Sequence, residues 1–251
     1  MDQNSINAAA QLLAEARRQH AGRPPLPDDL QPKTIDDGHA IQDATVALLN
    51  ETIGGWKVGL DKDGVLSRAP IFKGVILSNP ARVPAASMPL LGIESEIAFR
   101  FLKDLPARAQ DYSRNEVEDA MEAFPAIELL NSRYAEPAKR STLEKLADCI
   151  TQGGIVCGKP RADWRSIDFS KLEVTLTVDG KEIARKTGSH PTGDPVPPVV
   201  ALVNALRKTT GMRAGVIVTA GTWTGVNYAS PTSLAVASFH EFEAVSVQFT
   251  A

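Results

Sequence analysis

The run from Leu91 to Phe101 alternates like a β-strand with one buried face, and this pattern limits the folds open to the chain. Because strand side chains repeat every second residue, the apolar ones share one face while Glu94 and Glu96 project from the other. The apolar face comprises Ile93, Ile97, Phe99 and Phe101. The run therefore predicts a strand that packs on a core and presents two carboxylates together.

The Glu94 and Glu96 pair has two interpretations. Neighbouring like charges repel, so a fold tolerates them most readily when a cation or an arginine neutralises them. A hard divalent cation takes oxygen ligands, which makes the pair a candidate metal site. The alternative is a solvated strand face on which Arg100 neutralises the pair.

Glu128 stands inside the short apolar segment from Pro125 to Leu130, which resembles a buried strand apart from this acid. Burial of an unpaired carboxylate is unfavourable, so Glu128 needs a partner. Three carboxylates from two strands, completed by water and substrate, is a usual way to hold Mg²⁺. The alternative is an ion pair with Arg133 or a capping position at a strand end, and the residues leave both open.

Several short motifs follow one another along the chain, and their order is more specific than any one of them. The first three are Gly55–Leu60, Ile93–Phe99 and Ala126–Arg133, and the rest are Ala147–Asp148, Gly188–Pro191, Leu202–Leu206 and Thr219–Gly225. Together they resemble the 2-keto-4-pentenoate hydratase and 4-oxalocrotonate decarboxylase family, a branch of the fumarylacetoacetate hydrolase superfamily. The resemblance spans nearly the whole chain.

The resemblance implies a set of site residues and a cofactor. Glu94, Glu96 and Glu128 match family residues that hold Mg²⁺ or Mn²⁺, and Lys57 matches an acid/base or substrate-orienting lysine. Ser189, His190 and Thr222 are weaker candidates for holding substrate, and Arg133 is expected to steady the carboxylate of Glu128. The resemblance also implies a homo-oligomer, in which a complex with a paralogous pathway enzyme is a further option.

The implied reaction is the addition of water to a short 2-hydroxy-dienoate, which gives a 4-hydroxy-2-oxo acid. A metal ion chelated by the 1-carboxylate and the 2-oxygen of the substrate would act as a Lewis acid and stabilise an enolate. Lys57 is expected to move a proton during ketonisation, with a pKa lowered by burial and nearby positive charge. From the residues alone, a strand lysine that extends to solvent is the favoured interpretation of Lys57, and the resemblance reverses this preference.

Some residues depart from the family pattern and leave other functions open. Asn131 stands where the family often has Asp, Cys149–Thr151 replaces an Asn-Ala-Ser string, and Asn227–Pro231 replaces a region with a Gly-Asp pair. Decarboxylation of a 2-oxo diacid and C–C hydrolysis of an acylpyruvate use the same kind of site. A non-catalytic ligand-binding or accessory paralogue, and a purely structural cation, are the remaining alternatives.

The composition is that of an ordinary globular enzyme. With 251 residues, 43% of them hydrophobic and 23% charged, the chain is long enough for one large core. A net charge of −3 with scattered basic residues disfavours nucleic acid as a partner. The absence of a long apolar run and of an apolar leader predicts a cytoplasmic protein with no membrane partner. Cys149 and Cys157 are expected to be reduced core residues.

The expected elements are mixed in order, which favours an α+β fold. Helices are predicted over Ser5–His20, from Asp36 or Asp37 to about Thr52, and over Pro197–Lys208, and two more are predicted to start at Ser113 and Ser141 in S-x-x-E capping boxes. Strands are predicted at Leu172–Val178, Val216–Ala220 and Ala244–Phe249, with an Asp179-Gly180 hairpin. The segment Gly153–Lys159 resembles a phosphate loop, but Pro160 replaces the required Ser or Thr and the segment is predicted to be a strand.

We therefore expect one domain over residues 1–251, with a helical part at 1–53 and a β-rich catalytic part at 54–251. The resemblance adds a specific architecture to this α+β expectation. It implies a mixed β-sheet roll of the fumarylacetoacetate hydrolase C-terminal type, with the N-terminal helices packed on it.

Overall fold

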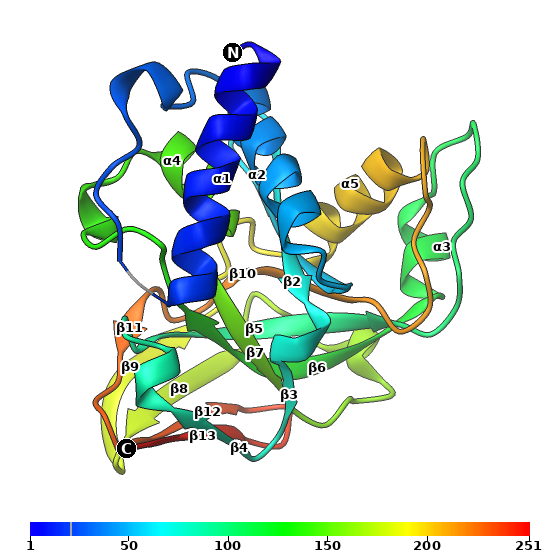
Figure 1. Cartoon of the computed structure of the whole chain (residues 1–251). Coiled ribbons are helices and arrows are strands. Elements are labelled where there is room, and N and C mark those ends of the chain that lie inside the picture. Colours follow the sequence, from blue (N-terminus) through cyan, green and yellow to red (C-terminus); the bar gives the residue numbers. More distant parts are fainter. Residues whose placement is uncertain (21) are drawn as a thin grey trace.

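The computed structural model describes residues 1–20 and 22–251, and two β-sheets form its base (Figure 1). The larger sheet has the order β2-β1-β10-β5-β6-β7-β3, with β11 paired to β5, and the smaller has the order β4-β13-β12-β8-β9. The strands are β1 (Ile53–Leu60), β2 (Leu66–Phe72), β3 (Ile76–Ser78), β4 (Ala81–Pro84), β5 (Gly92–Phe101), β6 (Met121–Leu130), β7 (Gln152–Cys157), β8 (Glu173–Val178), β9 (Lys181–Thr187), β10 (Ile217–Thr222), β11 (Asn227–Tyr228), β12 (Leu234–Phe239) and β13 (Val245–Thr250).

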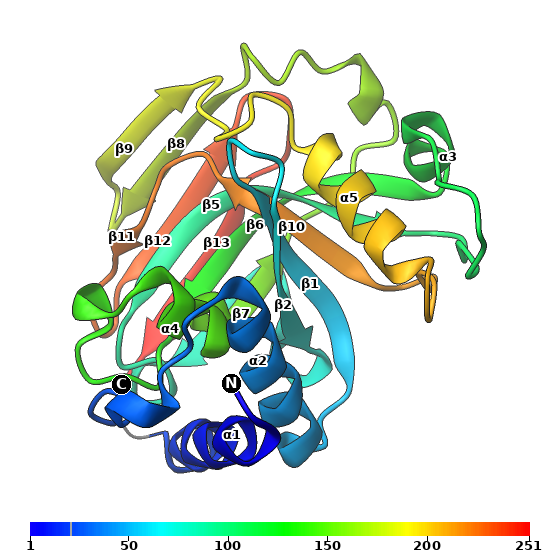
Figure 2. The ribbon, with the colours of Figure 1, turned by 90° about the horizontal axis from the view of Figure 1, so that it is seen from above.

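Both sheets are mixed, because parallel pairs (β1 with β10, β3 with β7, β13 with β4) occur beside antiparallel ones. The helices α1 and α2 stand upright above the level of the sheets in Figure 1, and α5 lies along the β1 and β10 side of the larger sheet (Figure 2). The helices are α1 (Gln3–Gln19), α2 (Ile35–Leu49), α3 (Arg114–Glu118), α4 (Thr142–Ala147) and α5 (Val196–Leu206). The predicted α+β class is confirmed.

The main core lies where the two sheets face each other. The apolar face of β5, with Ile93, Ile97 and Phe99, belongs to one buried cluster with residues of β8 and β13 such as Leu176 and Phe249. The alternating pattern therefore aims this face at the smaller sheet. Glu94 and Glu96 point to the opposite side, where the larger sheet curls so that β2 contacts β7. The curl encloses the carboxylate side of the sheet.

Helix ends follow the sequence closely, with one correction. The boxes at Ser113 and Ser141 cap α3 and α4 as predicted. Neither Asp36 nor Asp37 caps the second helix, because Thr34 caps α2 and Asp37 completes its capping box from the third helical position. Thr34 has extended dihedral angles and its hydroxyl accepts from the Asp37 amide, which is the geometry of an N-cap.

The remaining predicted elements are present with shifted ends. The hairpin at Asp179-Gly180 joins β8 and β9, and the segment that resembles a phosphate loop forms the buried strand β7. Cys149 and Cys157 are free and buried, as predicted. Over residues 1–20 and 22–251, no helix has the length and apolar character that a membrane crossing requires.

Candidate active site

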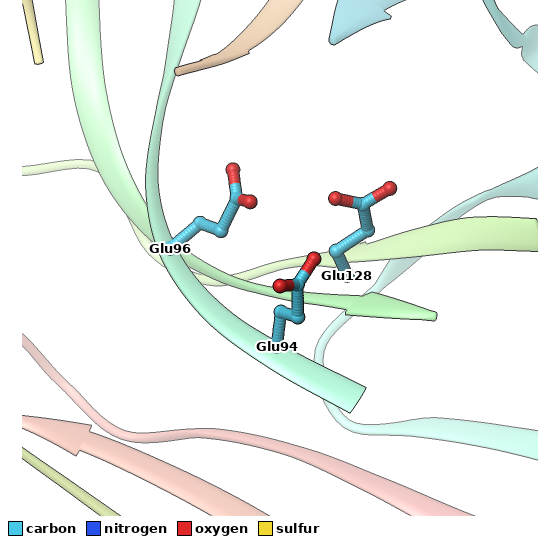
Figure 3. A group of neighbouring side chains, drawn as sticks. All are labelled: Glu94, Glu96 and Glu128. Carbon is cyan, nitrogen blue, oxygen red and sulfur yellow. The ribbon is translucent and has the colours of Figure 1, made fainter. Parts of the chain in front are cut away.

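Three glutamates meet on the carboxylate side of the larger sheet (Figure 3). Glu94 and Glu128 are direct partners across the β5 and β6 pair, and Glu96 follows on the same face of β5. Each offers an oxygen, and these oxygens all lie within 4.8 Å of one another. Hard divalent cations prefer such a set of oxygen ligands, so the predicted convergence of the three carboxylates is present in the structure.

Glu94, Glu96 and Glu128 do not form a solvated surface. Glu128 is fully buried, Glu96 is 2% exposed and Glu94 is half-buried. Within the described residues, no group donates a hydrogen bond to Glu128 Oε2, although burial normally demands a partner for such an atom. An oxygen without a donor beside two other carboxylates is suited to bind a cation.

The arginines that offered alternative partners lie elsewhere. Arg100 pairs with Glu122 at 2.9 Å across β5 and β6, so it does not neutralise Glu94 and Glu96. Arg133 pairs with Asp148 rather than with Glu128, which contradicts the expected support of Glu128. Asp148 therefore neutralises Arg133, and a different basic residue pairs with Glu128.

Lys57 is that base. Its Nζ lies 2.6 Å from Glu128 Oε1 and donates a hydrogen bond of 2.8 Å to the carbonyl oxygen of Ile150. Lys57 sits in the middle of β1, paired with Ala69 on β2 and Thr219 on β10, and it is buried. A lysine that extends to solvent is therefore excluded, and the amine is held at the carboxylates.

Burial and mutual charge set the ionisation of Lys57 and the three glutamates. Burial raises the pKa of Glu94 and of Glu128, and burial with the neighbouring Glu94 raises the pKa of Glu96 to about 7. Burial alone would lower the pKa of Lys57, but Glu128 and Glu94 outweigh it, and the pKa is raised. The three carboxylates around the amine thus stabilise its charged form. The lower pKa expected for Lys57 applies to a metal-filled pocket and stays a prediction.

The backbone beside Lys57 is strained. Cys149, Ile150 and Thr151 have φ values of 54°, 51° and 55°, so three successive residues are left-handed and none is glycine. This conformation costs about 1–2 kcal/mol per residue for L-amino acids. We call Cys149–Thr151 the left-handed turn. Such strain persists only where surrounding contacts enforce it, and it is often found at functional sites.

Arg133 supplies those contacts. Its guanidinium donates to the carboxylate of Asp148, to the Asp148 carbonyl oxygen at 2.7 Å and to the Gln152 carbonyl oxygen at 2.9 Å. Asp148 precedes the left-handed turn and Gln152 follows it. One planar side chain therefore holds both ends of the turn, and Arg133 and Asp148 are both buried.

The three predicted substrate-holding residues lie near Glu96, but their polar atoms already contact the protein. Thr222 is the cross-strand partner of Glu96, and its hydroxyl accepts from the Gly225 amide. Ser189 donates to the Trp223 carbonyl oxygen. His190 Nε2 lies 2.9 Å from the Ala220 carbonyl oxygen and its Nδ1 contacts Thr192. Their role in substrate binding stays a prediction.

His190 supports the strand beside Glu96. Its ring lies 4.6 Å from that of Trp223, and burial lowers its pKa, which favours the neutral form. Gly221 has a φ of 125°, and a Cβ there would lie 3.2 Å from His190 Nε2. The Gly221 amide is directed at Glu96 Oε2, 3.4 Å away. His190 thus packs behind the segment that approaches the carboxylates.

Sequence reasoning missed the Ile150 carbonyl, Asp148 and Gln152. No glycine or asparagine marks the left-handed turn, so the usual signal for positive φ is absent. The one sequence feature that marked this segment was that Cys149–Thr151 replaces the Asn-Ala-Ser string of the family. That difference did not reveal the backbone conformation.

A cavity of about 300 Å³ borders the left-handed turn. Its lining includes Arg17, Arg18, Asn131, Arg133 and Gln152, and Glu94, Glu96 and Glu128 are not part of that lining. Gln152 Nε2 is buried and has no hydrogen-bond acceptor among the described residues. The cavity wall therefore carries three arginines and several donors, together with one carboxylate, that of Glu51.

Residues 75–249 match the family model described as fumarylacetoacetate (FAA) hydrolase C-terminal. A 2-keto-4-pentenoate hydratase of Paraburkholderia phymatum is 27% identical over 232 residues, which cover 88% of each chain. A 2-keto-4-pentenoate hydratase 3 of Pseudomonas putida is 26% identical over 228 residues, which cover 85% of this chain and 83% of that protein.

Solved structures share the fold at lower identity. The 4-oxalocrotonate decarboxylase from Pseudomonas putida G7, complexed with magnesium and adipate, has a TM-score of 0.84 at 19% identity and covers 99% of this chain and 98% of its own. The fumarylpyruvate hydrolase from Pseudomonas aeruginosa, in complex with Mn²⁺ and pyruvate, has a TM-score of 0.57 at 14% identity and covers 78% of this chain and 88% of its own.

Proposed function

The chain belongs to the fumarylacetoacetate hydrolase C-terminal family, and we propose that it is a metal-dependent hydratase (a carbon-oxygen lyase) that adds water to a short 2-hydroxy-dienoate, as in aromatic catabolism. The observation that carries the proposal is the meeting of three carboxylates, two buried and one half-buried, with a buried lysine. The curated relatives at 26–27% identity are named as hydratases, which favours this reaction over others of the family.

We propose that Glu94, Glu96 and Glu128 hold Mg²⁺ or Mn²⁺. The donor set fits, since these are oxygen ligands on two paired strands and Glu128 Oε2 has no protein donor within the described chain. When bound, such a cation acts as a Lewis acid on the oxygens of a 2-oxo acid and stabilises the negative charge that develops there.

Lys57 is proposed to move the proton. Ketonisation transfers one proton from the 2-hydroxyl group of the dienol to C5, and water then adds across C3 and C4, with its hydroxyl on C4 and its proton on C3. The amine of Lys57 is held by Glu128 and by the Ile150 carbonyl, so its position is fixed before substrate arrives. Positive charge bound at the carboxylates would offset their effect and ease release of its proton.

Metal affinity is expected to depend on pH through Glu96. Its pKa is raised to about 7, and a cation binds only the ionised carboxylate. Affinity should therefore fall as pH decreases through about 7, and the Kd for Mg²⁺ should rise about 10-fold per pH unit for each proton that competes with the cation. Calorimetric titration at pH 6, 7 and 8 measures this. In Glu96→Gln the step near pH 7 should disappear, and a step that persists would assign it to another group.

The cavity beside the left-handed turn favours a second candidate, decarboxylation of a 2-oxo diacid. Arg17 and Arg18 line it beside a single carboxylate, Glu51, and guanidinium groups bind carboxylates. A substrate with a second carboxylate would find a counter-charge there, close to the turn that contacts Lys57. C–C hydrolysis of an acylpyruvate has no comparable support.

A turnover assay separates these functions. Protein reconstituted with Mg²⁺ or Mn²⁺ is mixed with 2-hydroxypenta-2,4-dienoate and, separately, with 2-oxo-3-hexenedioate. A hydratase should form 4-hydroxy-2-oxopentanoate from the first and release no CO₂ from the second. CO₂ release would favour the decarboxylase, and no turnover of either compound would favour a non-catalytic paralogue. The expected homo-oligomer, and a complex with a paralogous enzyme, stay predictions that light scattering can test.

A further inference from the structure

The left-handed turn is the part of the site that the proposed chemistry does not explain. Its middle carbonyl, that of Ile150, receives a hydrogen bond from Lys57 Nζ at 2.8 Å. A right-handed backbone at these residues would redirect that carbonyl. The position of the amine therefore depends on a conformation that Cys149, Ile150 and Thr151 do not favour by themselves.

The contacts that enforce the turn converge on its two ends. The Arg133 guanidinium donates to the Asp148 carbonyl at one end of the turn and to the Gln152 carbonyl at the other. The backbone amide of Arg133 donates a hydrogen bond of 3.0 Å to Asp148 Oδ2. Ser132 adds a hydroxyl bond of 2.8 Å to the same oxygen. Arg17 of α1 also donates to the Gln152 carbonyl, at 3.3 Å. The guanidinium of Arg133 is the one group in this set that joins both ends.

We propose that Arg133 is a positioning residue for Lys57. By bridging Asp148 and Gln152, it holds the left-handed turn closed, and the turn places the Ile150 carbonyl so that the Lys57 amine stays beside Glu128. Arg133 does not contact the amine or the carboxylates of the site. The part of this inference that concerns reaction rate rests on the proposed function, and the part that concerns the turn does not.

Lysine at position 133 tests the bridge without removing the charge. Arg133→Lys keeps a cation against Asp148, but a single ammonium cannot reproduce the planar fork that reaches both carbonyls. We expect kcat to fall about 10-fold or more because a small misplacement of a proton-transfer group is enough for this. The Kd for Mg²⁺ should stay within about 2-fold of the parent, since the metal ligands are untouched. Arg100→Lys, in a half-buried ion pair on β5, is the control and should retain kcat.

A glycine in the turn distinguishes positioning from general support. Glycine adopts positive φ without strain, so Ile150→Gly should reduce the need for the bridge. The double variant Arg133→Lys/Ile150→Gly should recover kcat to within about 3-fold of Ile150→Gly alone. Arg133→Lys alone could fail to reach the native state. In that case, recovery of the native fold and of kcat in the double variant would support the proposal in the same way. A loss that glycine does not restore, or no loss at all, would overturn the proposal.

Hydrogen exchange tests the turn without any reaction. The Asn131 amide donates to the Thr151 carbonyl at 2.8 Å, so its exchange reports opening of the turn. In Arg133→Lys this amide should exchange about 10-fold faster, while amides of Ile155 and Val156 in β7 stay protected. Unchanged exchange at Asn131 would contradict the bridge. If the parent hydrates no dienoate, the proposed function fails, and this measurement still decides the role of Arg133 in the turn.

Discussion

Replacing Lys57 with methionine is expected to lower kcat about 10²-fold or more, the scale for loss of a general acid or base. Methionine keeps a similar length and removes the proton-bearing atom that lies 2.6 Å from Glu128. Oxalate, a dicarboxylate that offers a cation the same pair of chelating oxygens as a 2-oxo acid and cannot react, should still bind because the cation supplies most of that affinity. Single-turnover kinetics of the Mg²⁺-loaded variant measure the loss of rate, and calorimetry measures the binding of oxalate.

The control for Lys57 is an exposed lysine in an ion pair. Lys159 pairs with Glu243 at the surface, and Lys159→Met should leave kcat unchanged because such pairs contribute little. If Lys57→Met turned over substrate as fast as the parent, the catalytic assignment would be wrong even with the family assignment intact. A parent without turnover on any dienoate would instead favour a binding protein.

The alternation of side chains along the strand predicted most of the site residues. Period-two alternation placed Ile93 and Phe99 on the core and Glu94 and Glu96 together on the other face, and the structure has this arrangement. The buried acid at Glu128 required a partner on energetic grounds, which the sequence left open between a cation and Arg133. Short-range patterns were sufficient because strand geometry fixes which side chains share a face.

The structure differs from the prediction where long-range contacts choose between local options. Arg133 lies near Glu128 in sequence, yet it binds Asp148, whose carboxylate also accepts from the backbone at Arg133 and from Ser132. A loop carboxylate that satisfies several donors at once competes better than a strand carboxylate already paired with Lys57. The left-handed turn was beyond sequence reasoning for a related reason, since tertiary bonds impose it on residues that disfavour it.

The pKa of Lys57 shows the same limit. The expectation of a lowered pKa assumed a metal-filled pocket, in which burial and nearby positive charge both disfavour the charged amine. The outcome is set by how many carboxylates surround it, and Glu128 and Glu94 reverse the direction. The number of charges within reach depends on how β1, β5 and β6 are brought together, which local pattern does not determine.

Replacing Glu128 with glutamine is expected to weaken Mg²⁺ binding by about 10²-fold or more. Loss of a group that only supports a ligand already costs 10- to 100-fold in metal affinity, so loss of a direct ligand should reach the upper end of that range. Lys57 keeps Glu94 and Glu96 as nearby carboxylates, so we expect the fold to persist. Calorimetry with Mg²⁺ gives the Kd, and circular dichroism checks the fold.

Thermal unfolding tests the same substitution through the stability that Mg²⁺ binding adds to the protein. At a Mg²⁺ concentration of 100 times the parent Kd, binding stabilises the parent by about 2.7 kcal/mol, whereas a variant with a Kd 100 times higher gains about 0.4 kcal/mol. Glu122→Gln is the matched control, because Glu122 lies on the same strand and pairs with Arg100 instead. It should keep the full gain. An equal gain in Glu128→Gln would mean that Glu128 is not a metal ligand and that its pairing with Lys57 is its role.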